Sequence, residues 1–448
     1  MFIGREKELE IFEKKIETNR FEFGIVYGRR RIGKTRLLQE IVNRHNAIYY
    51  VANEMGFEYN LKQLSATIAA YYNESFTFSS FETLFEYLAN RSVEKKTIII
   101  LDEFTYLMST NKELLSIFQN IIDHQLINSS VKLILSVSHV GMVEDSISYK
   151  KPLYGRATFK MKVEPFDYYD ASKFYPNATN IDKIRLYSVF GGVPFYTSRI
   201  DDTKSVKGNI ISLIIEEGAT FEEEVSFFLS QEVRSVSTYG KIINAIAMGA
   251  TKLNEISTKS GTANSGTTSK YLDLLITLGI VEKEYCFGEG TNTKKTIYKV
   301  KDQLFNFNYT FIEKYRTQKV IMKAGSFYDK VVQPYLDEFV SCEFERICTD
   351  FLKRVEAEAD RIEEIGRYWY NDSKLRRDVE IDIAMERAGA LFAFECKWTN
   401  AKIDKGIECD LEKKVQYLGD VIIGFFSKSG YSNVQSKHLY TVDDLYDF

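Results

Sequence analysis

The first 165 residues alternate short runs of apolar, mostly β-branched residues with longer segments whose apolar positions recur at helical spacing. The short runs predict strands at Phe23–Tyr27, Ile48–Val51, Thr97–Leu101 and Val131–Val137. Strands that alternate with helices are typical of a parallel sheet, and the nearly continuous apolar character of the last two runs is expected where helices cover both faces. We therefore expect an α/β domain over residues 1–165.

The segment 166–235 has helical spacing and few strand signals, so we interpret it as a helical lid. Its expected helices are Tyr168–Tyr175, Asp182–Phe190, Val206–Glu217 and Phe221–Leu229.

Residues 236–302 carry a third pattern, three helices followed by two strands around a glycine-rich tip, which predicts a winged helix. The helices are expected at Gly240–Met248, Lys252–Ser260 and Thr267–Leu278, and the strands at Ile280–Phe287 and Thr296–Val300. A helical connector over 303–326 then leads to a separate α/β domain over 327–448. That domain is expected to contain a helix from Phe327 and strands at Glu364–Tyr370, Val379–Met385, Leu391–Cys396 and Val421–Phe426.

A glycine-rich loop joins the first strand to the helix that follows it. Gly28, Gly33, Lys34 and Thr35 form the pattern G-x-x-x-x-G-K-T, which is a phosphate-binding loop in this strand–loop–helix context. Glycines let backbone N–H groups converge on phosphate oxygens, the lysine reaches the β- and γ-phosphates, and the threonine hydroxyl can ligate Mg²⁺. The sequence therefore predicts a site for ATP and Mg²⁺.

Asp102 and Glu103 follow the third apolar run, where such a loop needs an acidic partner. Asp102 can hold the metal through water, and Glu103 is placed to polarise an attacking water molecule. Two adjacent acids with separate roles indicate ATP hydrolysis as well as binding.

Several stretches together resemble the archaeal-type ATPase family, a signal-transduction branch of the AAA+ class. They are Phe2–Leu9, Gly28–Arg31, Leu153–Ala157 and Gly191–Pro194. The resemblance implies that Gly4 and Arg5 lie near the entry of the adenine site and that Pro194, in the lid, packs on the base. It also implies that Ser136 or Ser138 is the polar sensor of the γ-phosphate, and we count Ser138 in the predicted site.

Arg156 matches a Gly-Arg element of the same family. Its guanidinium could carry charge to the phosphates or could form a structural ion pair, and the sequence leaves both open. Arg31 and Arg36 are counted as nucleotide-binding candidates. Arg29–Arg31 have two alternative partners to the nucleotide: a neighbouring subunit of a homo-oligomer, or nearby acidic side chains.

The predicted winged helix carries more lysine than acidic residues, with Thr267–Lys270 at the start of its third helix and Lys294, Lys295 and Lys299 in its wing. This favours DNA as a partner. The alternative is a winged helix that packs against the lid and works as an internal switch.

In the last domain, Asp382 precedes Glu395 and Lys397, and residues two apart on a strand share a face. Two carboxylates and a lysine suit metal-assisted phosphodiester hydrolysis with Mg²⁺ or Mn²⁺. The set resembles the PD-(D/E)xK restriction-endonuclease-like fold, although the proline of that signature is absent. The resemblance implies a further acid from the preceding helix, for which Glu345 fits best and Glu343 is the other candidate, and Gln416 could add a polar contact.

Composition narrows the class of protein. The chain has 448 residues, a formal net charge of −4 and five cysteines without a C-x-x-C pair, so neither a uniformly basic surface, a disulfide framework nor a zinc knuckle is indicated. It contains neither a secretory leader nor an apolar run long enough to span a bilayer, so we expect a cytoplasmic protein without a membrane partner. The expectation is a P-loop AAA+ ATPase switch, binding ATP and ADP, that controls a DNA-binding or DNA-cleaving domain. The alternative is a nucleotide-gated regulator or scaffold whose nuclease-like domain is catalytically silent.

Overall fold

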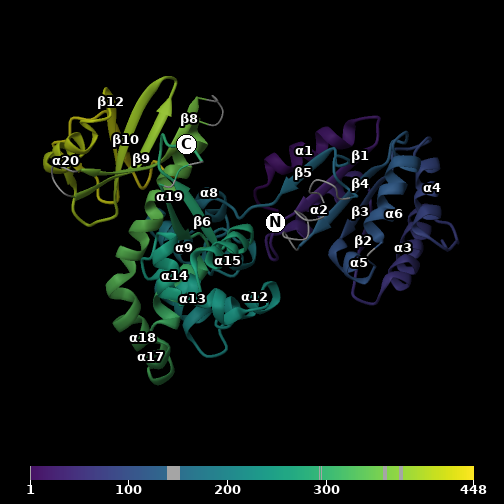
Figure 1. Ribbon diagram of the computed structural model, residues 1–448, viewed down its shortest axis with the longest axis horizontal. Helices are drawn as coiled ribbons and strands as arrows, with labels where there is room; N and C mark the ends of the chain where they lie inside the picture. Colours follow the sequence, from purple (N-terminus) through teal and green to yellow (C-terminus); the bar gives the residue numbers. More distant parts are fainter. Residues whose placement is uncertain are drawn as a thin grey trace. The chain divides into compact units, whose positions relative to one another are not determined.

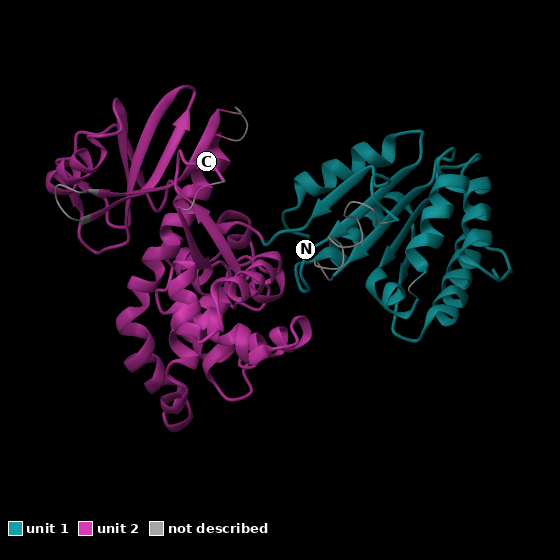
Figure 2. Cartoon of the chain, viewed as in Figure 1, with its two compact units in different colours: residues 1–165 teal, residues 166–448 magenta. Residues whose placement is uncertain are grey.

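The computed structural model describes residues 2–111, 113–138, 152–291, 293, 295–356, 361–372 and 377–447. The chain divides into two compact units, Met1–Pro165 and Phe166–Phe448 (Figure 2).

Unit 1 is built on a parallel five-stranded sheet with the strand order β2-β3-β4-β1-β5 (Figure 1). The strands are β1 (Glu22–Tyr27), β2 (Ile48–Val51), β3 (Ile98–Asp102), β4 (Lys132–Val137) and β5 (Phe159–Lys162). β4 separates the strand that precedes the glycine-rich loop from the strand that ends at Asp102. The carboxyl ends of β1 and β3 nevertheless lie at the same edge of the sheet, because all the strands are parallel.

Helices cover both faces of this sheet. One face packs against a layer containing α3 (Phe57–Tyr72), α4 (Phe81–Arg91), α5 (Phe104–Thr110) and α6 (Leu114–Ile121). The other lies against α1 (Glu6–Glu17) and α2 (Lys34–His45), which contact each other. β3 and β4 are buried along their whole length, as the sequence predicts for strands covered on both sides.

The sequence did not predict β5, whose residues Phe-Lys-Met-Lys alternate apolar and charged side chains. Edge strands keep one side in solvent and therefore lack the apolar run that marks a central strand. β5 pairs with β1 and lies at the edge of the sheet.

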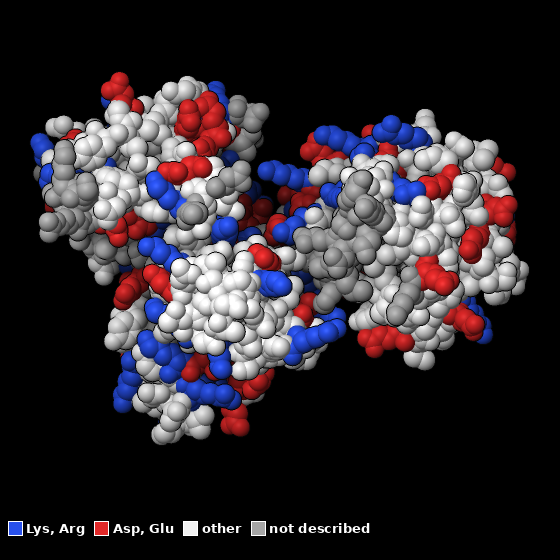
Figure 3. All heavy atoms as spheres, viewed as in Figure 1, with Lys and Arg blue, Asp and Glu red and all other residues white. Residues whose placement is uncertain are grey.

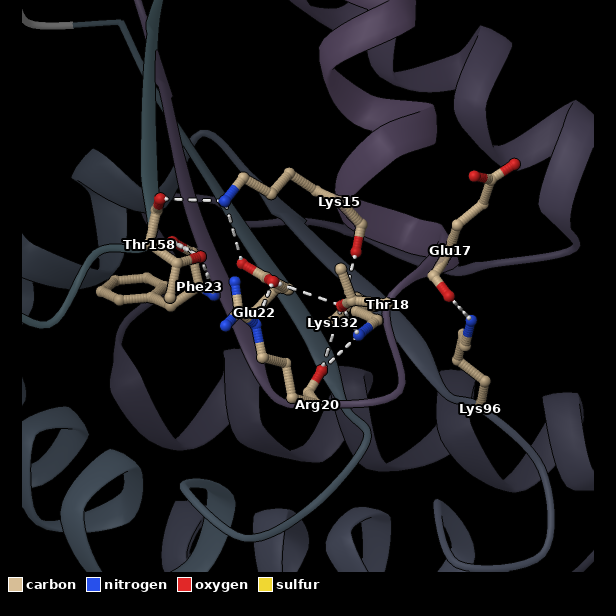
Figure 4. A network of polar contacts seen from close by, with 9 residues as sticks. All are labelled: Lys15, Glu17, Thr18, Arg20, Glu22, Phe23, Lys96, Lys132 and Thr158. Atoms are coloured by element: carbon tan, nitrogen blue, oxygen red, sulfur yellow. Dashed lines mark hydrogen bonds and ion pairs between the residues drawn. The ribbon is translucent and has the colours of Figure 1, made fainter.

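A polar network closes the end of the sheet opposite the glycine-rich loop (Figure 4). Lys132, only 2% exposed, donates to the hydroxyl of Thr18 at 2.8 Å and to the carbonyl of Arg20. Glu22, 1% exposed, accepts from Arg20 at 3.0 Å and from Lys15 at 3.4 Å. Burial, followed by the nearby charge of Lys96, lowers the pKa of Lys132 to about 8.

Unit 2 begins with helices and short helical turns. These are α8 (Tyr168–Ser172), α9 (Asn180–Phe190), α10 (Pro194–Thr197), α11 (Val206–Ile210), the π-helix η2 (Ile211–Ile215) and α12 (Glu224–Glu232). One predicted helix, Val206–Glu217, is thus an α-helix that continues as a π-helix. Gly192 approaches the backbone here so closely that an added Cβ would lie 1.7 Å from the carbonyl oxygen of Phe166.

Three helices and a two-stranded hairpin follow in the predicted order. They are α13 (Val236–Ala247), α14 (Leu253–Ser260), α15 (Ser265–Thr277), β6 (Val281–Tyr285) and β7 (Thr296–Val300). The two strands pair antiparallel, and the helices and strands share one apolar core. Lys294, which we counted in the predicted wing, lies outside the described residues.

Short helical segments connect this hairpin to the long helix α19 (Leu336–Glu356). They are α16 (Gln303–Phe307), η3 (Asn308–Glu313), α17 (Arg316–Ile321), α18 (Ala324–Phe327), η4 (Tyr328–Val332) and η5 (Gln333–Tyr335). α19 leads to a mixed five-stranded sheet with the order β14-β12-β10-β9-β8. Its strands are β8 (Ile362–Asp372), β9 (Arg377–Arg387), β10 (Ala390–Lys397), β12 (Val421–Ser427) and β14 (His438–Thr441). The helix α20 (Lys405–Val415) lies between β10 and β12 in the chain, and β11 (Ile403–Asp404) and β13 (Tyr431–Ser432) form a separate two-stranded sheet.

Contacts tie the parts of unit 2 to one another. The N–H of Phe287, beyond β6, donates to the carbonyl of Arg367 on β8 at 2.9 Å. Arg354 of α19 bonds Asp167 at the start of α8, and the hydroxyl of Tyr168 donates to the carbonyl of Leu445 at 2.8 Å. Figure 3 shows basic and acidic side chains interspersed over the visible face of each unit.

Candidate functional site

The glycine-rich loop lies between β1 and α2. An added Cβ at Gly28 would lie 2.6 Å from the carbonyl oxygen of Val163, so only glycine fits at this point of close approach. Gly33 caps the N-terminus of α2 with φ of 89°, a conformation that glycine adopts without strain. The loop thus leads directly into a helix N-terminus, where backbone N–H groups are available to an anion.

Lys34, the first residue of α2, is 5% exposed. Its ammonium donates to the carbonyl oxygens of Gly28 at 2.8 Å and Arg29 at 3.0 Å. The positive charge therefore lies within the curve of the loop.

Asp102, at the end of β3, is completely buried and accepts three hydrogen bonds. The hydroxyls of Thr35 and Tyr49 both donate to Oδ2 at 2.8 Å, and the N–H of Glu103 donates to Oδ1 at 2.9 Å. Burial, together with the Asp102 carboxylate, raises the pKa of Tyr49 well above its ordinary value, so the phenol keeps its proton as a donor. The structure thus brings Asp102 to the phosphate loop, as the sequence predicts for the acidic partner.

Glu103 follows in the left-handed conformation, with φ of 52°, which is uncommon for a residue that carries a side chain. Its carboxylate accepts from the hydroxyl of Ser138, just beyond β4, at 2.7 Å. Ser136, the other predicted sensor, is buried within β4, and among the described residues its hydroxyl has no hydrogen-bond partner. Of the two serines, Ser138 is the one that contacts an acidic residue of the site.

The predicted arginines occupy different positions. Arg5 is 7% exposed and donates to the carbonyl of Ile32 in the loop at 3.1 Å. Arg31 lies in the loop with φ of 70°, and Arg36 is exposed on the first turn of α2.

Arg156 contacts Asp123, with Nε and Nη2 donating to the two carboxylate oxygens at 2.8 and 2.6 Å. This is the ion-pair alternative that the sequence left open. Pro194, the predicted adenine contact, is the first residue of α10 in unit 2.

A second cluster of charged residues lies in the last sheet. Asp382 of β9 accepts from the N–H of Cys396 on β10 at 2.8 Å. Burial and the neighbouring carboxylate of Glu395 raise the pKa of Asp382 to about 6. The hairpin of β9 and β10 therefore brings together the two acids that the sequence paired.

Two lysines hold Glu395, which is only 5% exposed. Lys397, on the same strand, donates to Oε1 at 2.6 Å, and Lys414 of α20 donates to both oxygens, at 3.1 and 2.8 Å. Burial lowers the pKa of Lys397, but the charge and hydrogen bond of Glu395 together with the charge of Asp382 outweigh it, so its pKa lies above the ordinary value and the lysine stays charged. The carboxylate is neutralised from two elements of the fold.

Glu345 of α19 forms an ion pair with Arg367 of β8, which also bonds Glu380. Burial raises the pKa of Glu345 to about 7, with Arg367 opposing this rise and Asp382 adding to it. Glu343, the alternative acid, is directed elsewhere and accepts from Gln303 at 2.8 Å. Among the residues that the structure describes, no group of three or more His, Cys, Asp or Glu side chains could hold a metal ion.

Comparisons with known proteins agree with the phosphate-loop geometry. A family described as an ATPase domain predominantly from Archaea matches residues 2–200, and a family of archaeal and bacterial proteins of unknown function matches residues 308–408. An uncharacterized protein of Methanocaldococcus jannaschii is 31% identical over 429 residues, which are 94% of this chain and 93% of that protein. The chain belongs to this archaeal-type ATPase family.

Further matches of this ATPase are shorter or more distant. An uncharacterized ATP-binding protein of M. jannaschii is 45% identical over 42 residues, 9% of this chain and 71% of that protein. The solved structure of a Walker-type ATPase of Pyrococcus abyssi is 20% identical, covers 69% of this chain and 96% of that one, and has a TM-score of 0.50. That structure supports the fold. In the part of the ATPase that the structure describes, no helix is both long and apolar enough to cross a membrane.

Sequence reasoning missed three residues of the ATPase that contact the candidate sites: Tyr49, Arg367 and Lys414. Tyr49 could have been suspected from the alternation of β2, which directs it to the opposite face from the buried Tyr50. Lys414 lies in the last turn of α20, where a lysine is expected for the helix dipole alone. Arg367 carried no signal, since it reaches Glu380 only through the pairing of β8 with β9, and Glu345 only through the packing of α19 on β8.

Proposed function

We propose that this protein is an AAA+ switch that binds and hydrolyses ATP. The observation that carries the proposal is the hydrogen bond between Thr35 of the phosphate loop and Asp102 of β3, with Lys34 curled into the same loop. In this proposal Lys34 offsets the charge of the β- and γ-phosphates. Gly28, Gly33 and the N-terminus of α2 offer backbone N–H groups to the phosphate oxygens.

Hydrolysis is assigned to Glu103, which would orient water for in-line attack on the γ-phosphate. Ser138 holds the Glu103 carboxylate at 2.7 Å, so a change at the γ-phosphate that draws Ser138 away would free this base. Arg5, Arg31 and Arg36, all in unit 1, are proposed to bind nucleotide around the loop. Arg156 is given a structural role, because Asp123 occupies its guanidinium.

The residues around Asp102 fit the Mg²⁺ that accompanies ATP in this fold class. Thr35 offers a hydroxyl and Asp102 a carboxylate, and Mg²⁺ prefers oxygen donors, usually a few from the protein and the remainder from water and phosphate. Thr35 and Asp102 would hold the ion, which neutralises phosphate charge when bound.

The test is nucleotide binding and turnover by three proteins. Wild type should bind ATP and Mg²⁺ in calorimetry and release phosphate. Lys34→Ala should lose binding, whereas Glu103→Gln should bind ATP and lose turnover. Absence of binding to well-folded wild type would overturn the proposal.

We further propose that unit 2 comprises a lid over 166–235, a winged helix over 236–302, a connector over 303–326 and a restriction-endonuclease-like domain over 327–448. In this proposal the nucleotide state of residues 1–165 controls DNA binding by unit 2. DNA cleavage would need a second Mg²⁺ or Mn²⁺ at Asp382 and Glu395.

A specific observation favours the reading in which the last domain is catalytically silent. Lys397, Lys414 and Arg367 already neutralise Glu395 and Glu345, and the described residues include no group of three metal ligands. The carboxylates in this arrangement do not fit a metal, so we assign DNA binding or scaffolding without cleavage. Incubation with plasmid DNA, Mn²⁺ and ATP should leave the DNA intact, and nicking that Asp382→Ala abolishes would reverse the assignment.

A further inference from the structure

Tyr49 lies on β2, one of the two edge strands of the ATPase sheet, beside β3. Its neighbour Tyr50 points to the opposite face, where its hydroxyl donates to Asn60 at 2.7 Å. Two consecutive tyrosines thus make different hydrogen bonds, a partly buried one to the candidate site and a buried one within the core.

The Tyr49 hydroxyl reaches the same oxygen of Asp102 that Thr35 reaches, each at 2.8 Å. Because the N–H of Glu103 holds the other oxygen at 2.9 Å, the orientation of the carboxylate plane is defined from both ends. Thr35 is exposed at the loop, whereas Asp102 is completely buried and Tyr49 is half-buried behind it.

We propose that Tyr49 is a positioning residue that orients the Asp102 carboxylate toward the divalent cation accompanying the nucleotide. This inference rests on the proposed ATP and Mg²⁺ site and extends it to a residue outside the phosphate loop. Tyr49 does not contact nucleotide in this role. It acts through Asp102, so that the carboxylate keeps its orientation when the threonine hydroxyl turns toward the cation.

The physical reason is preorganisation. A ligand carboxylate fixed by neighbouring donors loses less rotational freedom when it meets a cation, and removal of such an outer partner typically lowers metal affinity about 10- to 100-fold. The effect should appear in the benefit that Mg²⁺ gives to nucleotide binding. It should not appear in nucleotide binding without metal, because Tyr49 holds only Asp102.

The experiment compares Tyr49→Phe with Tyr50→Phe in the full chain. Calorimetry measures the Kd for ADP with Mg²⁺ and with EDTA. The Kd in EDTA divided by the Kd with Mg²⁺ is the factor by which Mg²⁺ tightens binding. Tyr49→Phe should reduce this ratio about tenfold, near the lower end of the range for outer-sphere partners. The Kd in EDTA should stay within about twofold of wild type. Tyr50→Phe should lower the melting temperature through the loss of its bond to Asn60 and leave the ratio unchanged.

A double variant separates loss of carboxylate positioning from misfolding of the Tyr49→Phe protein. In an Asp102→Asn background the Tyr49→Phe change should leave the ratio as it is, because the carboxylate that Tyr49 orients is gone. An unchanged ratio in Tyr49→Phe, with wild type showing a clear Mg²⁺ benefit, would overturn this inference alone. Failure of wild type to bind ADP, or equal binding with and without Mg²⁺, would overturn the proposed site and this inference with it.

Discussion

The hydroxyl of Thr35 donates to Oδ2 of Asp102 at 2.8 Å, although the two residues lie 67 positions apart in the chain. In the sheet order one strand, β4, lies between β1 and β3, so the contact is made by the start of α2 reaching across the sheet edge. This bond joins the end of the phosphate loop to the acidic strand.

Thr35→Val keeps the shape of the side chain and removes the hydroxyl. We expect the folded variant to lose at least about tenfold in Mg²⁺-dependent nucleotide affinity, because a hydrogen bond to a charged group and an oxygen ligand disappear together. Thr35→Ser restores the hydroxyl and should bind nearly as wild type. Equal affinity of Thr35→Val and wild type in calorimetry would contradict the assignment.

Gly192→Ala should strongly destabilise unit 2. Its Cβ would lie 1.7 Å from the carbonyl oxygen of Phe166, which is backbone and cannot move without shifting the turn between α9 and α10. Overpacking of this kind typically costs about 1–3 kcal/mol or more. Gly325→Ala is the matched control, since nothing lies within 4 Å of a Cβ in α18 and the change should be neutral or slightly stabilising. Scanning calorimetry compares the two.

Lys132 should make stability rise with pH in alkaline solution. Its pKa is lowered from 10.5 to about 8 in the folded protein. Between these values the unfolded chain binds more protons than the folded one, so the free energy of unfolding increases as pH rises through this window. Below about pH 8 both states hold the proton and the contribution is constant.

Denaturant unfolding at several pH values measures this slope. Lys132→Met should remove the part of the slope that the buried ammonium causes, whereas Lys95→Met, at an exposed position of the loop between α4 and β3, should retain it. A slope that is the same in Lys132→Met and wild type would show that this lysine titrates normally.

Arg156 and Asp123 should behave as a structural pair. Arg156→Ala and Asp123→Ala should each reduce stability by about 1 kcal/mol, and the double variant should cost little more than either alone. Neither change should alter the Kd for ATP. An ATP affinity lost in Arg156→Ala and kept in Asp123→Ala would instead assign the guanidinium to nucleotide.

Lys414→Met should destabilise the last domain by about 1.5–3 kcal/mol, because it removes charge-assisted hydrogen bonds from the buried Glu395 carboxylate. Lys413→Met in the same helix turn is the control. Lys413 is 67% exposed and pairs with the 71% exposed Asp410, so its removal should change stability by less than about 0.5 kcal/mol. Thermal unfolding of the full chain distinguishes the two variants.

Local patterns predicted most of the elements. The runs around Phe23, Ile98 and Lys132 are central strands in the structure, because residues buried on both faces leave a continuous apolar signature, and the run at Ile48 is the edge strand β2. β5 and β14 were missed, since edge strands need only one apolar face. The helix expected at Val206–Glu217 changes to a π-helix at Ile211, a change in hydrogen bonding that side-chain periodicity does not encode.

Motif spacing determined the identity of the central site residues in advance. Gly28, Gly33, Lys34 and Thr35 are contiguous in the sequence, so their joint placement follows from one loop and one helix start. What only the tertiary structure decided are the partners that approach from other elements: Tyr49 at Asp102, Asp123 at Arg156, and Lys414 with Arg367 around the acids of the last sheet. Their side chains are ordinary in their own segments, and strand order and helix packing alone bring them within hydrogen-bonding distance.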